Sequence, residues 1–538
     1  MRAPGNRATN SCDPGGVAGP GRIGRVAIGD ILKRAARRFP QRIALTEGAR
    51  RITYTELERD ANRFANYLVS RGLKPGEKIS TVCNNSVEFV KALFGIHRAG
   101  LVWVPINTML GPDDMGFILD HAEVRFALID DNLHAQPDRR AALEKRGVDL
   151  IAVDLAGNAV KQGLQEFNAL LEGQSDIEPE IAFDDRDLAM IIYTSGTTSR
   201  PKGAMHCHLA VVMAAMSNAI EMHLDRNSGI TGQFPLFHCA AHVVLLSFLS
   251  VGGKMALMRG FDPVACLDAI DRDKLSFFIG LPLMYQVILD HPRRKEVDLS
   301  SLETCIYTMA PMSRPLIERC IAELCPNFVL PSGQTEMYPA TTMSQPDRQL
   351  QRFGNYWGES MIVNETAIMD DDGKLLPPGQ VGELVHRGPN VMLGYYKDPK
   401  ATEDSRRFGW HHTGDLAMID EQGEVLFVDR KKDMIKSGGE NVASIKIEET
   451  LLAHPAVLNA AVVGLPHPQW GEAVSAFVKL KPGVQADEAA IAEHCRKHLG
   501  GFQVPKFVKI VDEMPMTATG KLRKVELRQQ YSEHFAQG

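Results

Sequence analysis

The chain has 538 residues, of which 44% are hydrophobic and 23% are charged, and its formal net charge is −6. A chain of this length predicts about two to four domains, and its acidic balance argues against nucleic acid as the main partner. The nine cysteines form no C-x-x-C pair, which is typical of reduced thiols in a cytoplasmic enzyme.

The start of the chain predicts no folded element. Residues 1–25 are rich in Gly, Pro and Arg and lack an apolar stretch, so a disordered tail is expected there and not a secretory signal. Because this stretch has no Glu and a single Asp, a transit segment stays open as an alternative. The longest apolar run, around Val243 to Val251, is too short to span a bilayer and predicts a buried helix.

From residue 26 the chain alternates helical and strand patterns. A capping box is expected at Thr55-Glu56-Leu57-Glu58, followed by a helix that Gly72 ends. Next come a strand, a helix and a strand, at Lys78 to Val82, Val87 to Arg98 and Leu101 to Pro105. The alternation continues to about residue 430. It predicts an α/β fold, with a large N-terminal domain over residues 26–430 that has mainly parallel sheets flanked by helices.

A charged run at Asp429 to Asp433 marks an expected domain boundary. Residues 431–538 then predict a small C-terminal α/β domain. Its expected elements are a helix at Ile445 to Ala453, strands at Asn459 to Val463 and Val474 to Lys479, a helix at Asp487 to His498 and a strand at Val508 to Val511.

One loop has the composition of a phosphate-binding loop. A strand at Leu188 to Tyr193 leads into Thr194-Ser195-Gly196-Thr197-Thr198-Ser199-Arg200-Pro201-Lys202-Gly203. Glycine lets backbone N–H groups approach a phosphate, hydroxyls add donors, and lysine adds charge. Neither the order nor the spacing is that of a Walker A loop. Taken alone, the loop is equally typical of a plain turn.

Four further motifs follow in order along the chain. They are Ser332-Gly333-Gln334-Thr335-Glu336, then His411-His412-Thr413-Gly414-Asp415, then Asp429 to Asp433 with Gly438-Gly439, and finally Pro515 to Lys521. Alone, each has an ordinary structural explanation, such as a capped helix start, a turn or a solvated charge run. The paired histidines have no cysteine nearby and are interpreted as non-metal. Likewise, His206-Cys207-His208 lacks a second ligand pair at zinc spacing.

Taken together, the ordered set resembles the signature of the adenylate-forming (acyl-CoA synthetase, AMP-binding) superfamily, in its acid–CoA ligase branch. The resemblance extends from about residue 28 to 530. It implies ATP, Mg²⁺ and coenzyme A, and a mobile C-terminal lid domain. The implied contacts with ATP and CoA lie at Thr194, Ser195, Gly196, Thr197, Thr198, Lys202, Ser332, Gly333, Asp415, Arg430, Gly438 and Gly439.

The same resemblance implies individual roles. Thr335 would contact the α-phosphate, Glu336 would hold Mg²⁺, Lys521 would catalyse adenylation and Lys432 would be the hinge. The chain departs from the family at Ser199, where glycine is common, at Ser332, where an aromatic residue stacks on adenine, and at Lys446, where glutamate is common.

The acid pocket is expected around His238, Thr308, Met309 and Ala310. No aspartate follows the aromatic residue in Pro235-Leu236-Phe237-His238, which argues against an amino-acid substrate and a peptide synthetase. Thr308 and Met309 stand where related ligases carry small residues, so a medium-chain fatty or aryl acid is predicted. A long-chain fatty acid is the alternative, in which these side chains pack as core.

The predicted function is therefore an ATP-dependent carboxylic acid–CoA ligase. It would form an acyl-adenylate and then a thioester, releasing pyrophosphate and AMP. The expected partners are a small-molecule acid, ATP and CoA, without nucleic acid and without a transmembrane segment; a homodimer is left open. A luciferase-like oxygenase shares these motifs. A catalytically silent acyl-nucleotide-binding protein is disfavoured by the presence of Glu336, Asp415, Lys432 and Lys521.

Overall fold

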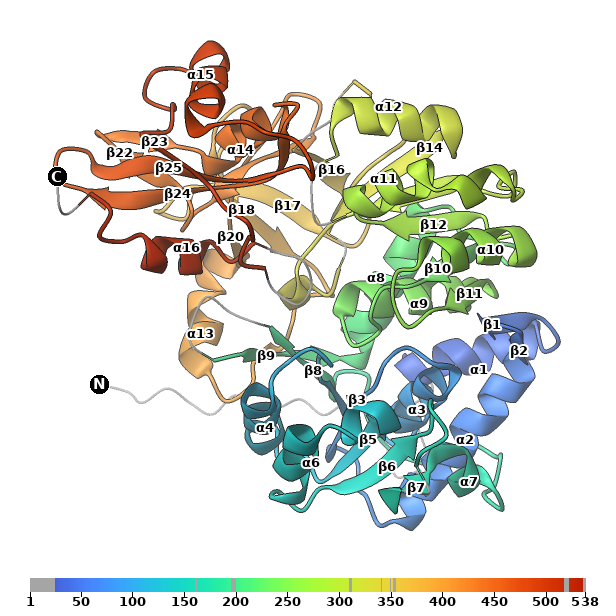
Figure 1. Cartoon of the computed structure of the whole chain (residues 1–538). Helices are drawn as coiled ribbons and strands as arrows, with labels where there is room; N and C mark the ends of the chain where they lie inside the picture. Colours follow the sequence, from blue (N-terminus) through green and yellow to red (C-terminus); the bar gives the residue numbers. More distant parts are fainter. Residues whose placement is uncertain are drawn as a thin grey trace, which may run out of the picture.

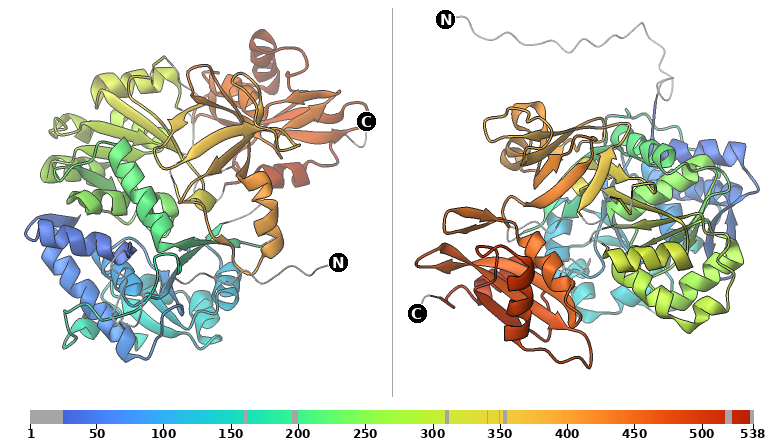
Figure 2. Two further views of the ribbon diagram at one scale, coloured as in Figure 1. Left: turned by 180° about the vertical axis from the view of Figure 1, so that it is seen from behind. Right: turned by 90° about the horizontal axis from the view of Figure 1, so that it is seen from above.

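A computed structural model describes residues 25–159, 162–194, 200–308, 312–339, 341–348, 350–351, 355–516 and 522–535. Apart from Arg25, the expected tail lies outside these residues. Figure 1 shows a large α/β body, coloured blue to orange, with a small orange-red body against one side. The views from behind and from above show the same two-part arrangement (Figure 2).

The first sheet is built mainly from residues 78–207 of the chain. Within the described residues it has eight strands in the order β19-β9-β8-β4-β3-β5-β6-β7. Strands β3 to β8 run parallel to one another, whereas β9 pairs with β8 and β19 pairs with β9 in the antiparallel direction. Its elements are β3 (Lys78–Val82), α3 (Val87–Arg98), β4 (Val102–Pro105), α4 (Pro112–His121), β5 (Phe126–Asp130), α5 (Asp131–His134), α6 (Pro137–Glu144), β6 (Asp149–Val153), β7 (Gln165–Glu166), α7 (Phe167–Leu171), β8 (Leu188–Thr194), β9 (Lys202–Cys207) and β19 (Gly394–Tyr395).

The second sheet has thirteen strands in the described chain, and only half of it is parallel. Parallel pairing runs from β1 through β11, β10, β12 and β13 to β14. The elements of this half are α1 (Ile28–Arg38), β1 (Ile43–Glu47), β2 (Arg50–Thr53), α2 (Tyr54–Ser70), α8 (His208–Glu221), β10 (Gly229–Gly232), α9 (Cys239–Val251), β11 (Lys254–Leu257), α10 (Pro263–Asp273), β12 (Phe277–Gly280), α11 (Pro282–Asp290), β13 (Thr304–Tyr307), α12 (Arg314–Glu323) and β14 (Asn327–Ser332).

Beyond β14 the expected alternation to residue 430 is wrong. The chain forms antiparallel strands β15 (Thr342–Ser344), β16 (Tyr356–Ser360), β17 (Glu365–Met369), β18 (Gly382–Arg387), β20 (His411–Ile419) and β21 (Val425–Arg430), with the short helix α13 (Pro399–Asp404). Tight turns make this possible, because a turn such as Asp420 to Gly423 reverses the chain directly into the next strand, where a parallel pair needs a long crossover.

The expected position of the capping box before α2 also needs correction. The capping box of α2 lies at Thr53 and Glu56, two residues before the expected position. Glu56 N donates to Thr53 Oγ1 at 3.2 Å, and the Glu56 carboxylate accepts from Thr53 N at 2.8 Å. Thr55 lies inside the helix, where its hydroxyl donates to the carbonyl of Pro40. The end of the helix was predicted correctly, since Gly72 follows it with φ of +81°.

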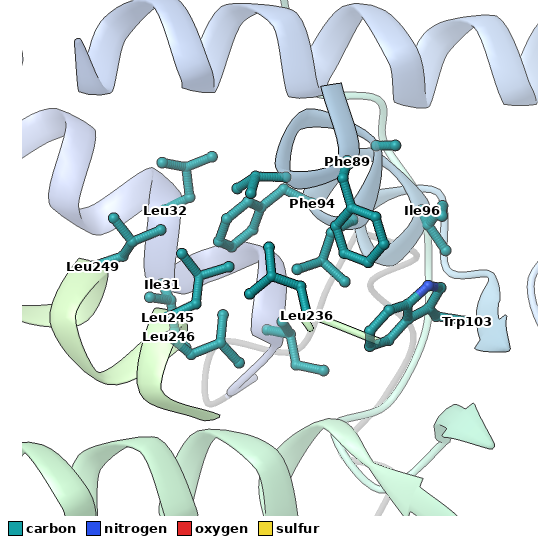
Figure 3. Close-up of a cluster of buried hydrophobic side chains, with 14 of the residues drawn as sticks. Ile31, Leu32, Phe89, Phe94, Ile96, Trp103, Leu236, Leu245, Leu246 and Leu249 are labelled. Carbon is teal, nitrogen blue, oxygen red and sulfur yellow. The ribbon is translucent and has the colours of Figure 1, made fainter. Parts of the chain in front are cut away.

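The main core lies between the two sheets. It joins residues of α1, α2, α3, α8 and α9 to residues that face them from both sheets. Figure 3 shows part of it, with Ile31 and Leu32 of α1, Leu245 and Leu249 of α9 and Trp103 of β4 in one cluster. Helix α9 is buried along nearly its whole length, as its apolar run predicted. No helix of the described chain is long and apolar enough to cross a bilayer.

The small domain has its own sheet and core. Five strands of the described chain form the sheet, in the order β23-β22-β25-β24, with β26 beside β25. Its elements are β22 (Ile435–Ser437), β23 (Glu440–Val442), α14 (Ser444–Leu452), β24 (Val457–His467), β25 (Gly471–Leu480), α15 (Glu488–His498), β26 (Phe507–Ile510) and α16 (Lys524–Gln530). Both expected helices and all three expected strands are present, and β24 and β25 are longer than expected.

Candidate active site

The phosphate-loop motif lies at the open ends of β8 and β9. Thr194 ends β8 and Lys202 begins β9, and the two are direct partners in the antiparallel pair. The loop between them therefore starts and ends at one edge of the first sheet. The expected nucleotide contacts Ser195, Gly196, Thr197 and Thr198 lie outside the described residues, as does the departure at Ser199.

The T-E motif follows β14 and begins a short 3₁₀ turn, Thr335–Met337. The hydroxyl of Thr335 is 3.4 Å from the sulfur of Cys239 at the start of α9. Ser332 ends β14, and its carbonyl accepts a hydrogen bond from Thr341 N at 2.6 Å. Gly333 connects the strand to the turn. This motif is thus held between the second sheet and α9.

A segment at residues 392–396 joins the T-E motif to β9. Met392 N donates to the carbonyl of Glu336 at 2.8 Å, and Leu393 N and Tyr396 N donate to carbonyls of β9 at 2.6 and 2.8 Å. The hydroxyl of Tyr395 donates to Glu336 Oε1 at 2.9 Å. The ammonium of Lys202 lies 5.3 Å from the centre of the Tyr395 ring. Lys202 and Glu336, far apart in the sequence, therefore flank one tyrosine.

The T-G-D motif lies on β20, beside the β21 strand that leads to the small domain. Asp415 is paired in register with Arg430, and Arg430 Nε is 3.5 Å from Asp415 Oδ1. His411, at the start of the same strand, is buried, and its Nε2 is 3.1 Å from Gln334 Oε1. Burial lowers the pKa of His411 to about 4, so the ring is neutral near pH 7 and links β20 to the T-E motif.

Glu383 of β18 organises the turn around Gly414. Its carboxylate accepts from Gly414 N at 3.1 Å and from Lys431 Nζ at 3.1 Å, and His412 Nδ1 lies 3.1 Å from it. Burial tends to raise the pKa of Glu383, but the hydrogen bonds from His412 and Lys431 outweigh it, and the pKa lies below its usual value. In the sequence Glu383 matches only a further, mainly structural motif of the family, Val381-Gly382-Glu383-Leu384 with Gly394-Tyr395, because its partners lie elsewhere in the chain.

Lys432 separates two anchored neighbours. Lys431 pairs with Asp371 of the large body at 2.6 Å, in addition to Glu383. Asp433, on the other side, pairs with Arg528 of α16 in the small body at 2.7 Å. Burial, and then the charge of Arg430, hold the pKa of Lys432 below its usual value. The residue therefore stands where the chain passes from one body to the other.

The two glycines expected to line a pantetheine tunnel lie elsewhere. Gly438 and Gly439 form the turn between β22 and β23, with φ of +61° and +89°. A Cβ on Gly438 would lie 2.8 Å from the ring of Trp470, so this position requires glycine on two grounds. Gly438 N donates to the carbonyl of Trp470 at 2.8 Å, and the contacts of the turn lie within the small domain. This arrangement therefore does not bring the glycines to the other motifs.

The expected acid-pocket residues are only partly described. His238 caps α9, because its Nδ1 accepts from Ala240 N at 3.3 Å. The neutral ring then carries its proton on Nε2 and can donate there. Thr308 follows β13 and is half-buried, directly after Tyr307, which packs in the core. Met309 and Ala310 lie outside the described residues, as does Lys521.

The His206-Cys207-His208 stretch has its contacts in the interior. The ring of His206 lies 5.2 Å from that of Tyr338, and His208 Nδ1 accepts from Ile28 N at 3.4 Å. Burial lowers the pKa values of His206 and His208 to about 3 and about 4. Among the residues that the structure describes, no group of three side chains could hold a metal ion by itself.

Two family models match the chain. The model described as AMP-binding enzyme matches residues 32–396, and the one described as AMP-binding enzyme C-terminal domain matches residues 446–521. A feruloyl-CoA synthase of Amycolatopsis sp is 34% identical over 94% of this chain and 99% of its own length. A 4-hydroxybutyrate–CoA ligase of Metallosphaera sedula is 31% identical over 93% of both chains.

Solved structures of other proteins are similar to this chain over nearly its whole length. The ATP-bound structure of MatB from Rhodopseudomonas palustris has a TM-score of 0.85 at 28% identity, covering 94% of this chain and 99% of its own. The apo structure of that protein, with the same identity and coverage, has a TM-score of 0.75. An anthranilate–CoA ligase in complex with anthranoyl-AMP has a TM-score of 0.86 at 25% identity, over 95% and 98% of the two chains. The chain therefore belongs to the family of AMP-binding enzymes.

Proposed function

We propose that this chain activates a medium-chain fatty or aryl acid with ATP and transfers the acyl group to coenzyme A. The protein is an AMP-forming acyl-CoA synthetase, in agreement with its family and with relatives of the same length. One observation carries the site assignment. Lys202 of β9 and Glu336 of the 3₁₀ turn contact the same tyrosine, and His411, on the strand that carries Asp415, contacts Gln334 beside the same turn.

In the first half-reaction the acid carboxylate attacks the α-phosphorus of ATP and pyrophosphate leaves. An anion approaches a polyanion, so the barrier falls where fixed positive charge and N–H donors surround the phosphates. We assign Lys202, the loop from Thr194 to Thr198, Thr335 and Lys521 to this task. Asp415 can accept hydrogen bonds from both ribose hydroxyls because a carboxylate accommodates two donors, and Arg430 lies beside it.

The residues present fit a magnesium ion at Glu336. Within the described chain the Glu336 carboxylate makes a hydrogen bond to Tyr395 and no ion pair. Its negative charge therefore requires a cation as partner when the negatively charged phosphates of ATP approach. Hard oxygen ligands of this kind suit Mg²⁺, which also binds phosphate oxygens. When bound, the ion offsets charge on the triphosphate.

The second half-reaction needs another arrangement, because Gly438 and Gly439 lie away from the site. We propose that the boundary falls between residues 430 and 431, and that the small domain rotates about Lys432 between its two anchored neighbours. Two findings support an adenylating arrangement here: the greater similarity to the ATP-bound than to the apo MatB structure, and the contacts of the β22–β23 turn, which lie within the small domain. Rotation would let two reactions share one pocket.

The acid is proposed from the pocket and the relatives together. Feruloyl-CoA synthase and anthranilate–CoA ligase are named for aryl acids, and 4-hydroxybutyrate–CoA ligase for a short aliphatic one. Thr308, half-buried at the end of β13, would narrow the channel, with His238 offering Nε2–H at the start of α9. A long straight-chain fatty acid is the alternative.

Acid-dependent exchange of pyrophosphate into ATP, measured over aryl acids and aliphatic acids of increasing length, tests the assignment. The proposal expects exchange with aryl and medium-chain acids without CoA, and loss of exchange in Lys521→Ala. Exchange that is absent with every acid would favour a silent nucleotide-binding protein. Cytoplasmic location and a homodimer stay predictions, which cell fractionation and light scattering of the purified protein would test.

A further inference from the structure

Tyr395 occupies the space between the proposed phosphate lysine and the proposed metal carboxylate. Its hydroxyl donates to Glu336 Oε1 at 2.9 Å, and its ring lies 5.3 Å from the ammonium of Lys202. In the described chain Lys202 and Glu336 form no ion pair with each other. The lysine contacts the ring and the carboxylate contacts the hydroxyl, so one tyrosine bridges two groups of opposite charge, which attract each other in a partly buried site.

The position of Tyr395 does not depend on its hydroxyl. Its backbone N donates to Thr402 Oγ1 at 2.9 Å, and β19 is paired in register with β9. On either side, Met392 N and Tyr396 N bond to the carbonyls of Glu336 and Gly203. Removing the hydroxyl alone should therefore leave the segment and the ring in place.

We propose that Tyr395 is a positioning residue, which orients Glu336 for Mg²⁺ and keeps Lys202 free for the triphosphate. A hydrogen bond to Oε1 fixes the plane of the carboxylate and leaves Oε2 as the oxygen that faces a cation. The cation–π contact holds the ammonium over the ring without neutralising it. This inference rests on the proposed function, in which Glu336 binds the metal and Lys202 binds phosphate.

Calorimetric binding of a non-cleavable α,β-methylene ATP analogue, in excess Mg²⁺ and in EDTA, measures the effect without turnover. Tyr395→Phe should weaken binding in Mg²⁺ by about tenfold and leave binding in EDTA unchanged, because a hydrogen bond to a charged group is lost. Tyr396→Phe is the matched control. The Tyr396 hydroxyl bonds to Glu123 at 3.2 Å, away from the site, so this variant should behave as the wild type.

Two further variants separate the two parts of the role. In Mg²⁺, the double variant Glu336→Gln with Tyr395→Phe should bind the ATP analogue no more weakly than Glu336→Gln alone, because the Tyr395 hydroxyl acts through the Glu336 carboxylate. Tyr395→Leu removes the ring as well, lets Lys202 pair with Glu336, and should weaken binding in EDTA too. Unfolding midpoints should be equal for Tyr395→Phe and Tyr396→Phe.

The outcomes distinguish this inference from the proposed function. If Glu336→Gln abolishes the Mg²⁺ dependence while Tyr395→Phe binds as the wild type does, the role of Tyr395 is overturned and that of Glu336 stands. If Tyr395→Phe weakens binding equally in Mg²⁺ and in EDTA, it acts on the fold and the inference is also overturned. If wild-type affinity is the same in both buffers, the metal role of Glu336 is wrong.

Discussion

Asp429 and Ser444 connect the two bodies of the molecule. Asp429 is the last residue but one of β21 in the large body, and Ser444 is the first residue of α14 in the small one. The two carboxylate oxygens of Asp429 accept from Ser444 N at 2.5 Å and from Ser444 Oγ at 3.2 Å. Burial raises the pKa of Asp429 above its usual value. If the small domain rotates about Lys432, this contact has to break or change partners, and so it stabilises the arrangement seen here.

Ser444→Ala should therefore slow adenylation more than thioester formation. Losing a hydrogen bond to a carboxylate shifts the balance of arrangements by about fivefold or more. The two half-reactions are measured separately, by pyrophosphate exchange and by CoA transfer from supplied acyl-adenylate. Ser532→Ala, which removes a hydroxyl bonded within the small domain, is the control. An equal decrease of both half-reactions in Ser444→Ala alone would argue against a role in selecting the arrangement.

Lys432→Pro should keep pyrophosphate exchange and lose CoA transfer. Proline fixes φ at this residue, while Lys431 and Asp433 stay anchored to the two bodies, so that the change of arrangement is blocked. Lys432→Ala removes the same side chain without fixing φ and should retain both reactions. Near-normal CoA transfer in Lys432→Pro would show that the pivot lies elsewhere.

Acid should destabilise the fold through buried histidines. Burial lowers the pKa values of His208, His242 and His386 to about 4, 3 and 3. Their folded pKa values lie below the unfolded value of about 6.5, so the unfolded chain binds more protons between these limits. The contribution of these histidines to the free energy of unfolding is then fully present above about pH 6.5. It decreases as the pH drops, by about 1.4 kcal/mol per histidine and pH unit.

Proton uptake on unfolding in urea at pH 5.0 measures this effect directly. These three rings should contribute about three protons per chain. His386→Asn, which keeps an amide near Thr366 Oγ1 in place of the ring nitrogen, should lower the uptake by about one. Uptake at pH 5.0 no greater than at pH 7.5 would mean that these rings are protonated in the fold.

Thr308→Gly should shift the preference toward longer acids. Each methylene that the channel newly accommodates contributes about 0.8 kcal/mol, so the ratio of kcat/KM for the longer over the shorter acid should rise about tenfold per two carbons. Thr304→Gly, the same change at the other end of β13, should leave the ratio unchanged. A wild-type optimum at long straight chains would show that Thr308 does not limit the pocket.

The sequence predicted those parts of the fold that depend on local pattern. The bounds of β3 and α3 agree with the structure because periodicity and the cap at Ser86 define them within a few residues. At α2, both Thr53 and Thr55 are followed three residues later by glutamate, and only the extended backbone of Thr53 decides which one caps the helix. The antiparallel half of the second sheet depends on pairing between distant strands, which no local pattern reveals.

The site shows the same division. The pattern of glycine, hydroxyl and charge marked the loop from Thr194 to Lys202, whereas the roles of Glu336 and Asp415 were implied only by the resemblance to the family. The structure brings Lys202 and Glu336 into contact with one tyrosine. Gly394-Tyr395 matches a mainly structural motif of the family, which assigns Tyr395 no contact with the site; its partner Glu336 lies 59 residues away. Glu383 matches the same mainly structural motif, and its partners His412 and Lys431 come from other parts of the chain.

The most direct test of the central claim is the product ratio of the complete reaction with the purified wild-type enzyme. AMP, pyrophosphate and acyl-CoA are quantified by chromatography with ATP, Mg²⁺, CoA and a panel of aryl and medium-chain acids. We predict that AMP and acyl-CoA form in equal amounts with at least one of these acids, and that neither forms when ATP, CoA or the acid is omitted. Formation of ADP and phosphate with the thioester, or of AMP without any thioester, would contradict an acid–CoA ligase that acts through an acyl-adenylate.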